Sequence, residues 1–365
     1  MQGHSSERRM IAAREPVQRP VDGKLLVVDG EGRLTHAPRT ALIDFLRPAD
    51  LVIANDAATL PASLRGVHKP SGAAIEARLA ASPSLAPDAV QRFTAVVFGE
   101  GDYRTRTEDR PLPPPLAPGD VLVLGTLAAV VEKLLGHPRL VALRFAASPA
   151  EVWEGIARHG RPIQYSHVQS PLALWDVWTA IAGPPVAFEP PSAGFVLDWQ
   201  TLSAMHKRGI AFATLTLAAG ISSTGDAALD ARLPFDEPYH IPPTTARTIR
   251  CTQAKGGRVV AIGTTVVRAL EHAALTDGRV RPGSGLATQR VDRNTRLGVV
   301  AAIVTGTHEP GQSHYELLRA FAGEATLQRV SGELDTHSYR THEFGDTLLI
   351  ERQATMEARH RLAAA

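Results

Sequence analysis

The chain contains very little cysteine, since Cys251 is the only one among 365 residues. An intrachain disulfide and a cysteine-based zinc site are therefore excluded, and the single thiol favours a reducing compartment. The first ten residues, MQGHSSERRM, lack the apolar core of a secretory signal, and no uninterrupted apolar run reaches membrane-spanning length. Together these absences predict a soluble, cytoplasmic protein.

Several common catalytic motifs are also absent. There is no Walker loop and no GxGxxG, because Gly283-Ser284-Gly285 lacks the third glycine, and no Gly-x-Ser-x-Gly elbow occurs. His308-Glu309 begins like the zinc-protease motif, but Gln312 stands where the second histidine is required. Four histidines lie late in the chain, and solvated or hydrogen-bonded side chains are favoured for them over a metal site: His308, His314, His337 and His342.

Composition is that of an ordinary globular protein. Hydrophobic residues make up 44% and charged residues 21%, and the length suffices for one large domain or two medium ones. The formal net charge of +2 neither requires nor excludes a nucleic-acid partner, because a local basic patch can exist in a nearly neutral chain.

The stretch from Gly256 to Glu271, GGRVVAIGTTVVRALE, is the most informative in the chain. An apolar, β-branched run over residues 258–262 predicts a buried strand, and the apolar spacing after Gly263 predicts a helix. Thr264 and Thr265 are expected to cap this helix. Free backbone N–H groups at such a turn suit an anion or the polar edge of a nucleoside. An ordinary threonine-capped connection between a strand and a helix is the alternative.

The remaining pattern predicts an α/β main domain with a mixed sheet, plus an inserted all-β barrel-like domain. Strands are expected at 25–28, 51–54, 210–217, 297–304 and 346–351, with helices at 40–46, 198–207, 244–254 and 313–321. Short strands without long helices, at 74–80, 93–98, 121–124 and 140–145, predict the barrel. A capping box at Ser148–Glu151 begins a helix after it. The predicted domains are a loose extension over 1–20, the main domain over 21–63 and 148–365, and the barrel over 64–147.

Polar loops follow several of the predicted strands. They contain Asn55-Asp56, Ser192-Ala193-Gly194, Gly263-Thr264-Thr265, Thr305–Pro310 and Tyr339–Asp346. Ligands collect at the carboxyl ends of strands in open α/β sheets, so these loops are expected to converge on one cleft.

The order of these motifs resembles the S-adenosylmethionine:tRNA ribosyltransferase-isomerase family of queuosine biosynthesis, from about Lys24 to Glu351. The stretch ending in IANDAATLPASLRG is similar to the family's Asn-Asp-Thr-Arg-Val and Pro-Ala-Arg-Leu motifs, and PPSAGF to Pro-Thr-Ala-Gly-Leu-His-Phe. GGRVVAIGTTVVRALE is close to the family's most regular block. TGTHEP resembles Thr-Asn-Phe-His-Leu-Pro, AFAG matches outright, and YRTHEFGDTLLI resembles Tyr-Arg-Phe-Phe-Ser-Tyr-Gly-Asp-Ala-Met-Leu-Ile.

The resemblance implies ribosyl transfer from S-adenosylmethionine, used as a co-substrate, to an aminomethyl-deazaguanine in the tRNA anticodon loop. The product is epoxyqueuosine, adenine and methionine are released, and no metal is involved. Such chemistry needs a base near the carbon beside the sulfonium and donors for the departing adenine. The implied catalytic residues are His308, Asp56 and Arg340. The implied substrate-binding residues are Asn55, Ser192, Gly194, Gly263, Thr264, Thr265, Arg268 and Asp346.

Three positions depart from the family motifs toward small apolar side chains. Ala58 replaces the arginine of Asn-Asp-Thr-Arg, while Val196 and Ala218 replace two motif histidines. Their loss predicts a less polar cleft with fewer proton carriers. Two alternatives therefore stay open: a divergent paralog acting on another acceptor, and a catalytically silent nucleoside- or RNA-binding protein.

Overall fold

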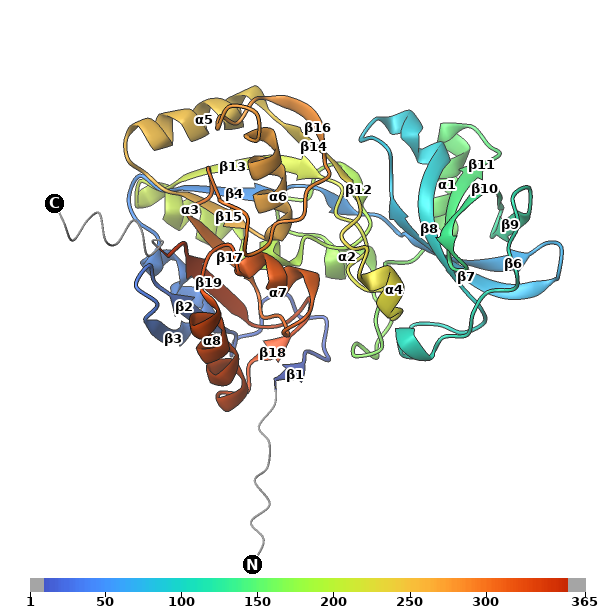
Figure 1. Cartoon of the computed structure of the whole chain (residues 1–365), viewed down its shortest axis with the longest axis horizontal. Coiled ribbons are helices and arrows are strands. Elements are labelled where there is room, and N and C mark those ends of the chain that lie inside the picture. The colour runs from blue at the N-terminus through green and yellow to red at the C-terminus, as the bar shows by residue number, and fades with distance from the viewer. Residues whose placement is uncertain (1–9, 354–365) are drawn as a thin grey trace, which may run out of the picture.

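The computed structural model describes residues 10–353 and contains a nine-stranded mixed sheet beside a closed β-barrel (Figure 1). In spatial order the strands are β16 (Gly283–Ala287), β14 (Glu237–Ile241), β13 (Ala211–Leu217), β4 (Leu51–Asn55), β15 (Val259–Ile262), β17 (Ala302–Gly306), β19 (Thr347–Glu351), β2 (Lys24–Val28) and β3 (Leu34–Pro38). Four central strands, β13, β4, β15 and β17, are parallel, and β19 is antiparallel to β17 but parallel to β2.

Both faces of the central strands are covered, which explains their uninterrupted apolar sequences. In β15, Val259 and Ala261 belong to the core on one face, and Val260 and Ile262 belong to the core on the other. The first core also takes side chains from α5 (Pro243–Ala254), α6 (Thr264–Ala273), α7 (Ser313–Leu318) and α8 (Glu324–Thr336). The second takes them from η1 (Arg39–Phe45) and α3 (Trp199–Lys207). This alternation with period two fixes the register of the sheet.

Six antiparallel strands close the barrel, which lies to the right of the sheet in Figure 1. In spatial order they are β10 (Leu127–His137), β11 (Leu140–Phe145), β8 (Arg92–Phe98), β7 (Ala73–Ala81), β6 (Ser63–His68) and β9 (Val121–Leu124). Helix α1 (Pro149–His159) follows, and its Val152 and Ile156 belong to the barrel core. The predicted capping box is confirmed at Ser148 and Glu151, whose side chains accept each other's backbone N–H.

The predicted fold class, an α/β domain with an inserted β-barrel, is therefore confirmed, while the residue limits of the domains stay a prediction. Of the predicted extension, residues 1–9 lie outside the described residues, and β1 (Ile11–Ala12) pairs with β18 (Arg340–Thr341). No helix within residues 10–353 is long and apolar enough to cross a membrane. The shorter elements are β5 (Ala58–Thr59), η2 (Pro87–Gln91), η3 (Thr107–Asp109), α2 (Leu174–Val177), β12 (Pro185–Ala187), η4 (Ser192–Val196) and α4 (Ala227–Asp230).

Several local predictions were wrong. Thr264 and Thr265 do not cap a helix, because α6 begins after Gly263 without a side-chain cap. The helix expected over 40–46 is the 3-10 helix η1, which begins after Pro38. The strand expected over 297–304 begins only at Ala302. The reason is that the carboxylate of Glu271 accepts the backbone N–H groups of residues 298–300, which are then not available to a strand.

Candidate functional site

The predicted polar loops meet at one edge of the sheet. The carboxyl ends of β13, β4, β15 and β17 lie beside the amino ends of β19 and β2, because β19 runs opposite to β17 and β2 runs parallel to β19. Loops that follow the first four strands and loops that precede the last two therefore share this edge, which we call the site edge. In open α/β sheets this is the side on which ligands bind.

Asn55 is the last residue of β4, and Asp56 follows it at the site edge, next to the end of β13. The buried Asn55 amide donates to the Leu217 carbonyl (2.9 Å) and accepts from the Leu217 and Ala57 N–H groups (3.0 and 3.1 Å). Asp56 is half-buried and its Oδ1 accepts from the Thr216 hydroxyl at 2.6 Å. Asn55 thus holds the loop in shape, while Oδ2 of Asp56 has no side-chain hydrogen-bond partner within residues 10–353.

Gly263 brings two of the predicted loops together. Its φ of 91° and ψ of 158° belong to a region that only glycine adopts readily. An added Cβ would lie 3.3 Å from the Cβ of Ala193, so the 263–265 turn packs against the 192–194 loop. On the other side, the Thr265 hydroxyl lies 3.5 Å from the Asn55 amide nitrogen. Thr264 is buried at the start of α6.

A small hollow lies next to this turn. It is lined by Arg39, Ser192, Thr305, Gly306, His342 and Asp346, among others. Arg39 is 8% exposed, and its Nη2 has no hydrogen-bond partner among residues 10–353. A buried cation with a free donor in a hollow is suited to bind a carboxylate or phosphate.

Two of the predicted site residues, Arg268 and Asp346, use their charged groups in hydrogen bonds and ion pairs that hold the fold together. Arg268 is buried, pairs with Glu237 and donates to the carbonyls of Phe235, Ala287 and Gln289. Asp346 is also buried and accepts from the backbone N–H groups of Lys24 and Arg340, both at 2.8 Å. In the described structure Arg268 braces α6 against β14 and β16, and Asp346 fixes the start of β19.

Arg340 is less enclosed than Asp346. Its Nη2 lies 3.2 Å from Asp346 and 3.1 Å from Asp22, and its side chain is 28% exposed. Its backbone carbonyl accepts the Thr307 hydroxyl at 2.5 Å, which ties the loop after β17 to the loop before β19.

His308 is the second residue of the loop between β17 and α7. Its Nε2 is 3.1 Å from the Thr305 hydroxyl, and its ring stacks on that of His314 with a centroid distance of 4.7 Å and an interplanar angle of 13°. Burial, with the nearby His314 and His342, holds the pKa of His308 well below its usual value. The imidazole is therefore neutral near pH 7 and can accept a proton.

A second imidazole pair lies near His308. His167 and His342 stack at 4.2 Å and 16°, and the Nε2 of His167 lies 2.9 Å from the Glu343 carboxylate. His342 has a φ of 69°, which is uncommon for a residue other than glycine. One ring nitrogen each of His167 and His342 and one carboxylate oxygen of Glu343 all lie within 4.8 Å of one another.

A buried carboxyl lies where the 192–194 loop begins. Glu189 is 7% exposed and accepts a short hydrogen bond from the Tyr165 hydroxyl, whose oxygen also lies 3.0 Å from the Ser223 carbonyl. Burial raises the pKa of Glu189 to about 7, although hydrogen bonds from Ser222 and Tyr165 partly oppose this rise. Glu189 can therefore donate or accept a proton near neutral pH.

Sequence reasoning missed several residues of this region: Arg39, Tyr165, His167, Glu189 and Glu343. His167 and Tyr165 stand in an irregular segment between α1 and α2, where no periodicity marks them. Glu189 directly precedes the Pro190-Pro191-Ser192 loop that the sequence had selected, so its position next to that loop was an available signal.

The three replaced family positions are also placed by the structure. Ala58 and Ala218 are buried, and Ala218 belongs to the barrel core, while Val196 is half-buried in η4. All three are apolar and none supplies a proton carrier. The titratable groups that the structure brings to this region are instead His167, His308, His342, Glu189 and Glu343.

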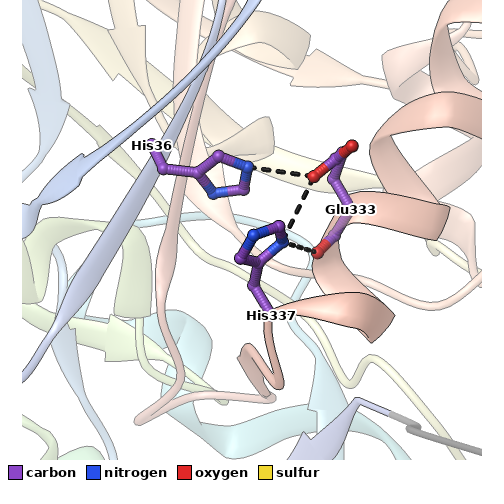
Figure 2. Close-up of side chains that lie close together, drawn as sticks. All are labelled: His36, Glu333 and His337. Atoms are coloured by element: carbon purple, nitrogen blue, oxygen red, sulfur yellow. Dashed lines mark hydrogen bonds and ion pairs between the residues drawn. The ribbon is translucent and has the colours of Figure 1, made fainter.

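Another group of histidines lies between β3 and the end of α8. Figure 2 shows the carboxylate of Glu333 to one side of the imidazoles of His36 and His337. One carboxylate oxygen lies 3.1 Å from His36 Nε2 and 3.2 Å from His337 Nδ1, and the two ring centroids are 4.1 Å apart. His36 belongs to the edge strand β3, and Glu333 and His337 lie at the end of α8. Their side chains are 34–48% exposed, and the other ring nitrogen of His36 contacts the Tyr339 hydroxyl at 2.9 Å.

Comparison with known proteins identifies similar sequences over almost the whole chain. A sequence model of the family described as "Queuosine biosynthesis protein" matches residues 7–350. An S-adenosylmethionine:tRNA ribosyltransferase-isomerase from Pelobacter propionicus is 31% identical over 93% of this chain and 96% of its own. One from Geobacter sulfurreducens is 32% identical with the same coverage. A solved S-adenosylmethionine tRNA ribosyltransferase from Thermotoga maritima is 24% identical over 93% of this chain and 96% of its own, with a TM-score of 0.49.

Proposed function

Because the chain belongs to the queuosine biosynthesis protein family, we propose that it is an S-adenosylmethionine:tRNA ribosyltransferase-isomerase. The match of the family over residues 7–350, with relatives of that name at about 30% identity, is the observation that carries this proposal. The reaction moves the ribosyl part of S-adenosylmethionine to an aminomethyl-deazaguanine in tRNA. Adenine and methionine leave, and the acceptor becomes epoxyqueuosine.

We assign the nucleoside to the site edge, between Asp56 and the turn at 263–265. Thr265 and Asp56 present polar groups there, and the positive φ of Gly263 shapes the turn. Arg39, with its unpartnered Nη2, is placed to bind the carboxylate of the methionine part. Asn55 and Asp346 hold the surrounding loops, and Arg268 braces α6, so their effect on binding is indirect.

His308 is the proposed base for the carbon beside the sulfonium. It is a neutral imidazole two residues after the end of β17, and the Thr305 hydroxyl contacts its Nε2. Glu189, whose pKa of about 7 leaves it partly protonated at neutral pH, is the proposed donor for the departing adenine. Arg340 and Ser192 complete the proposed lining of the cleft.

The macromolecular substrate of the proposed reaction is tRNA, and the anticodon loop is the part proposed to enter the site. Bases of such a loop are single-stranded and can be splayed into a cleft without opening a duplex. A cytoplasmic location follows from this proposed substrate.

A second candidate is ribosyl transfer to a different acceptor. Ala58, Val196 and Ala218 stand where the family motifs have arginine and histidine, while Glu189 and the His167–His342 pair add other proton carriers to the same region. This candidate keeps the S-adenosylmethionine site and changes only the acceptor.

The test is nucleoside analysis of modified tRNA. The protein is incubated with S-adenosylmethionine and tRNA that carries the aminomethyl-deazaguanine. The tRNA is then digested to nucleosides, which are separated and identified by mass spectrometry. Epoxyqueuosine in the digest supports the proposal. Unchanged precursor at enzyme concentrations that convert it fully with a typical relative contradicts it.

A further inference from the structure

The cleft contains a set of side chains that the proposed reaction does not need. We propose that the imidazoles of His167 and His342 and the carboxylate of Glu343 bind one divalent metal ion of the zinc type. This inference goes beyond the proposed function, for which the family resemblance implies no metal.

The types of the potential ligand atoms and the distances between them support a metal site. Two imidazoles and one carboxylate are a ligand set that suits Zn²⁺ and its neighbours, and not Mg²⁺ or Ca²⁺, which prefer oxygen. The ligand atoms lie within 4.8 Å of one another, and a tetrahedral Zn²⁺ places its ligands about 3.4 Å apart. Because the two imidazoles stack nearly parallel, one of them has to rotate out of the stack for both nitrogens to face the same ion.

The hydrogen bonding of the three side chains leaves lone pairs free. Neither ring nitrogen of His342 has a hydrogen-bond partner among residues 10–353; its ring only stacks on His167. His167 contacts Glu343 through Nε2, and its Nδ1 has no partner in the same part of the chain. These nitrogens are not among the fully buried, unpartnered atoms of residues 10–353, so solvent reaches them and a metal ion can as well.

The backbone presents His342 in a strained conformation. Its φ of 69° is held by the turn in which Gly345 N–H donates to the His342 carbonyl (2.9 Å) and Asp346 N–H to the Arg340 carbonyl (2.7 Å). A non-glycine residue in this region persists where the surrounding structure fixes it, and such residues cluster at functional sites. Here the turn directs residues 342 and 343 toward His167.

The surroundings leave coordination positions open. His167 and Glu343 line one small hollow with Tyr165 and Gln164, and His342 and Glu343 line the other with Ser192 and Thr305. Three protein ligands and an open side are typical of zinc sites that accept water or substrate.

The His36–Glu333–His337 group provides an internal control. It offers the same donor types within the same distance, but it is more exposed, with side chains 34–48% accessible against 14% and 21% for His167 and Glu343. The His36→Ala variant removes a ligand of this second group, together with the contact between His36 and the Tyr339 hydroxyl, and leaves His167, His342 and Glu343 in place. It is the reference protein for every titration.

The experiment measures Zn²⁺ binding to the His36→Ala protein by competition with a chromogenic chelator, and Co²⁺ binding by its visible absorption. One saturable Zn²⁺ per chain is expected. Adding His342→Asn, which tolerates the left-handed backbone, or Glu343→Gln should weaken binding at least about tenfold, since even ligand-supporting residues contribute this much. Circular dichroism verifies that the variants are folded.

Two results overturn the proposal. One is the absence of saturable Zn²⁺ binding in the His36→Ala protein, which assigns any binding by the unmodified chain to the surface group. The other is binding that is unchanged by both His342→Asn and Glu343→Gln. Neither readout depends on tRNA or S-adenosylmethionine, so failure here is distinguishable from failure of the proposed function.

Discussion

Replacing Glu189 by glutamine should change how the stability of the protein depends on pH. Burial first, and then the nearby Glu343, raise the pKa of the Glu189 carboxyl from its ordinary 4.5 to about 7, against hydrogen bonds from Ser222 and Tyr165 that lower it. Glutamine preserves the shape and the hydrogen-bonding oxygen of Glu189 but cannot ionise.

The sign follows from the raised pKa. Below about pH 4.5 the carboxyl is protonated in both the folded and the unfolded protein and has no effect on pH dependence. Between 4.5 and 7 only the unfolded chain loses its proton, so the free energy of unfolding falls as pH rises. Each pKa unit is worth about 1.4 kcal/mol, so the full loss above pH 7 is about 3 kcal/mol.

The assay is urea unfolding of both proteins from pH 4.5 to 8, followed by tryptophan fluorescence. The stability of Glu189→Gln relative to the unmodified chain should increase by about 3 kcal/mol across this range. Tyr165→Phe removes a hydrogen bond that lowers the pKa of Glu189, so this variant should show a larger fall in stability. Parallel pH profiles for the unmodified chain and Glu189→Gln would refute the reasoning.

Three further substitutions test the site. Arg268→Met leaves the buried Glu237 carboxylate without its ion-pair partner and should destabilise the fold by about 3–5 kcal/mol in urea unfolding. The exposed Arg281→Met is the control and should have no measurable effect, so equal effects would contradict the structural role of Arg268. Gly263→Ala, at a φ of 91°, should cost about 1–3 kcal/mol in thermal unfolding and weaken S-adenosylmethionine binding in calorimetry, and unchanged binding would remove the turn from the site. Arg39→Met should weaken S-adenosylmethionine binding about tenfold or more but leave adenosine, which has no carboxylate, unaffected; an equal loss for both ligands would exclude a carboxylate contact.

The fold class could be predicted because its signals are local. The apolar run before Gly263, the capping box at Ser148 and the alternating segments of the barrel each depend on neighbouring residues only. Strand β10 was missed because its second half, with Glu132 and Lys133 exposed, does not read as a buried strand.

The site was predictable only in part, for a physical reason. Strand ends identify which loops share an edge, so Asp56, Ser192, Gly263 and His308 could be selected from the sequence. Which side chains remain free for a ligand depends on contacts between distant residues.

Two arginines illustrate this dependence on distant contacts. Arg268 was expected to bind substrate, but its guanidinium pairs with the carboxylate of Glu237, 31 positions away. Arg39 was not selected from the sequence, yet it is buried and lines the hollow, and its Nη2 has no hydrogen-bond partner among residues 10–353. Neither outcome can be derived from local spacing.

Adenine release from S-adenosylmethionine, measured with and without tRNA carrying the aminomethyl-deazaguanine, tests the central claim most directly. The account predicts release that requires this tRNA, occurs in a one-to-one ratio with modified acceptor, and is lost in His308→Ala while the fold is retained. Absence of release with this tRNA, together with release in the presence of a different acceptor, would contradict the claim.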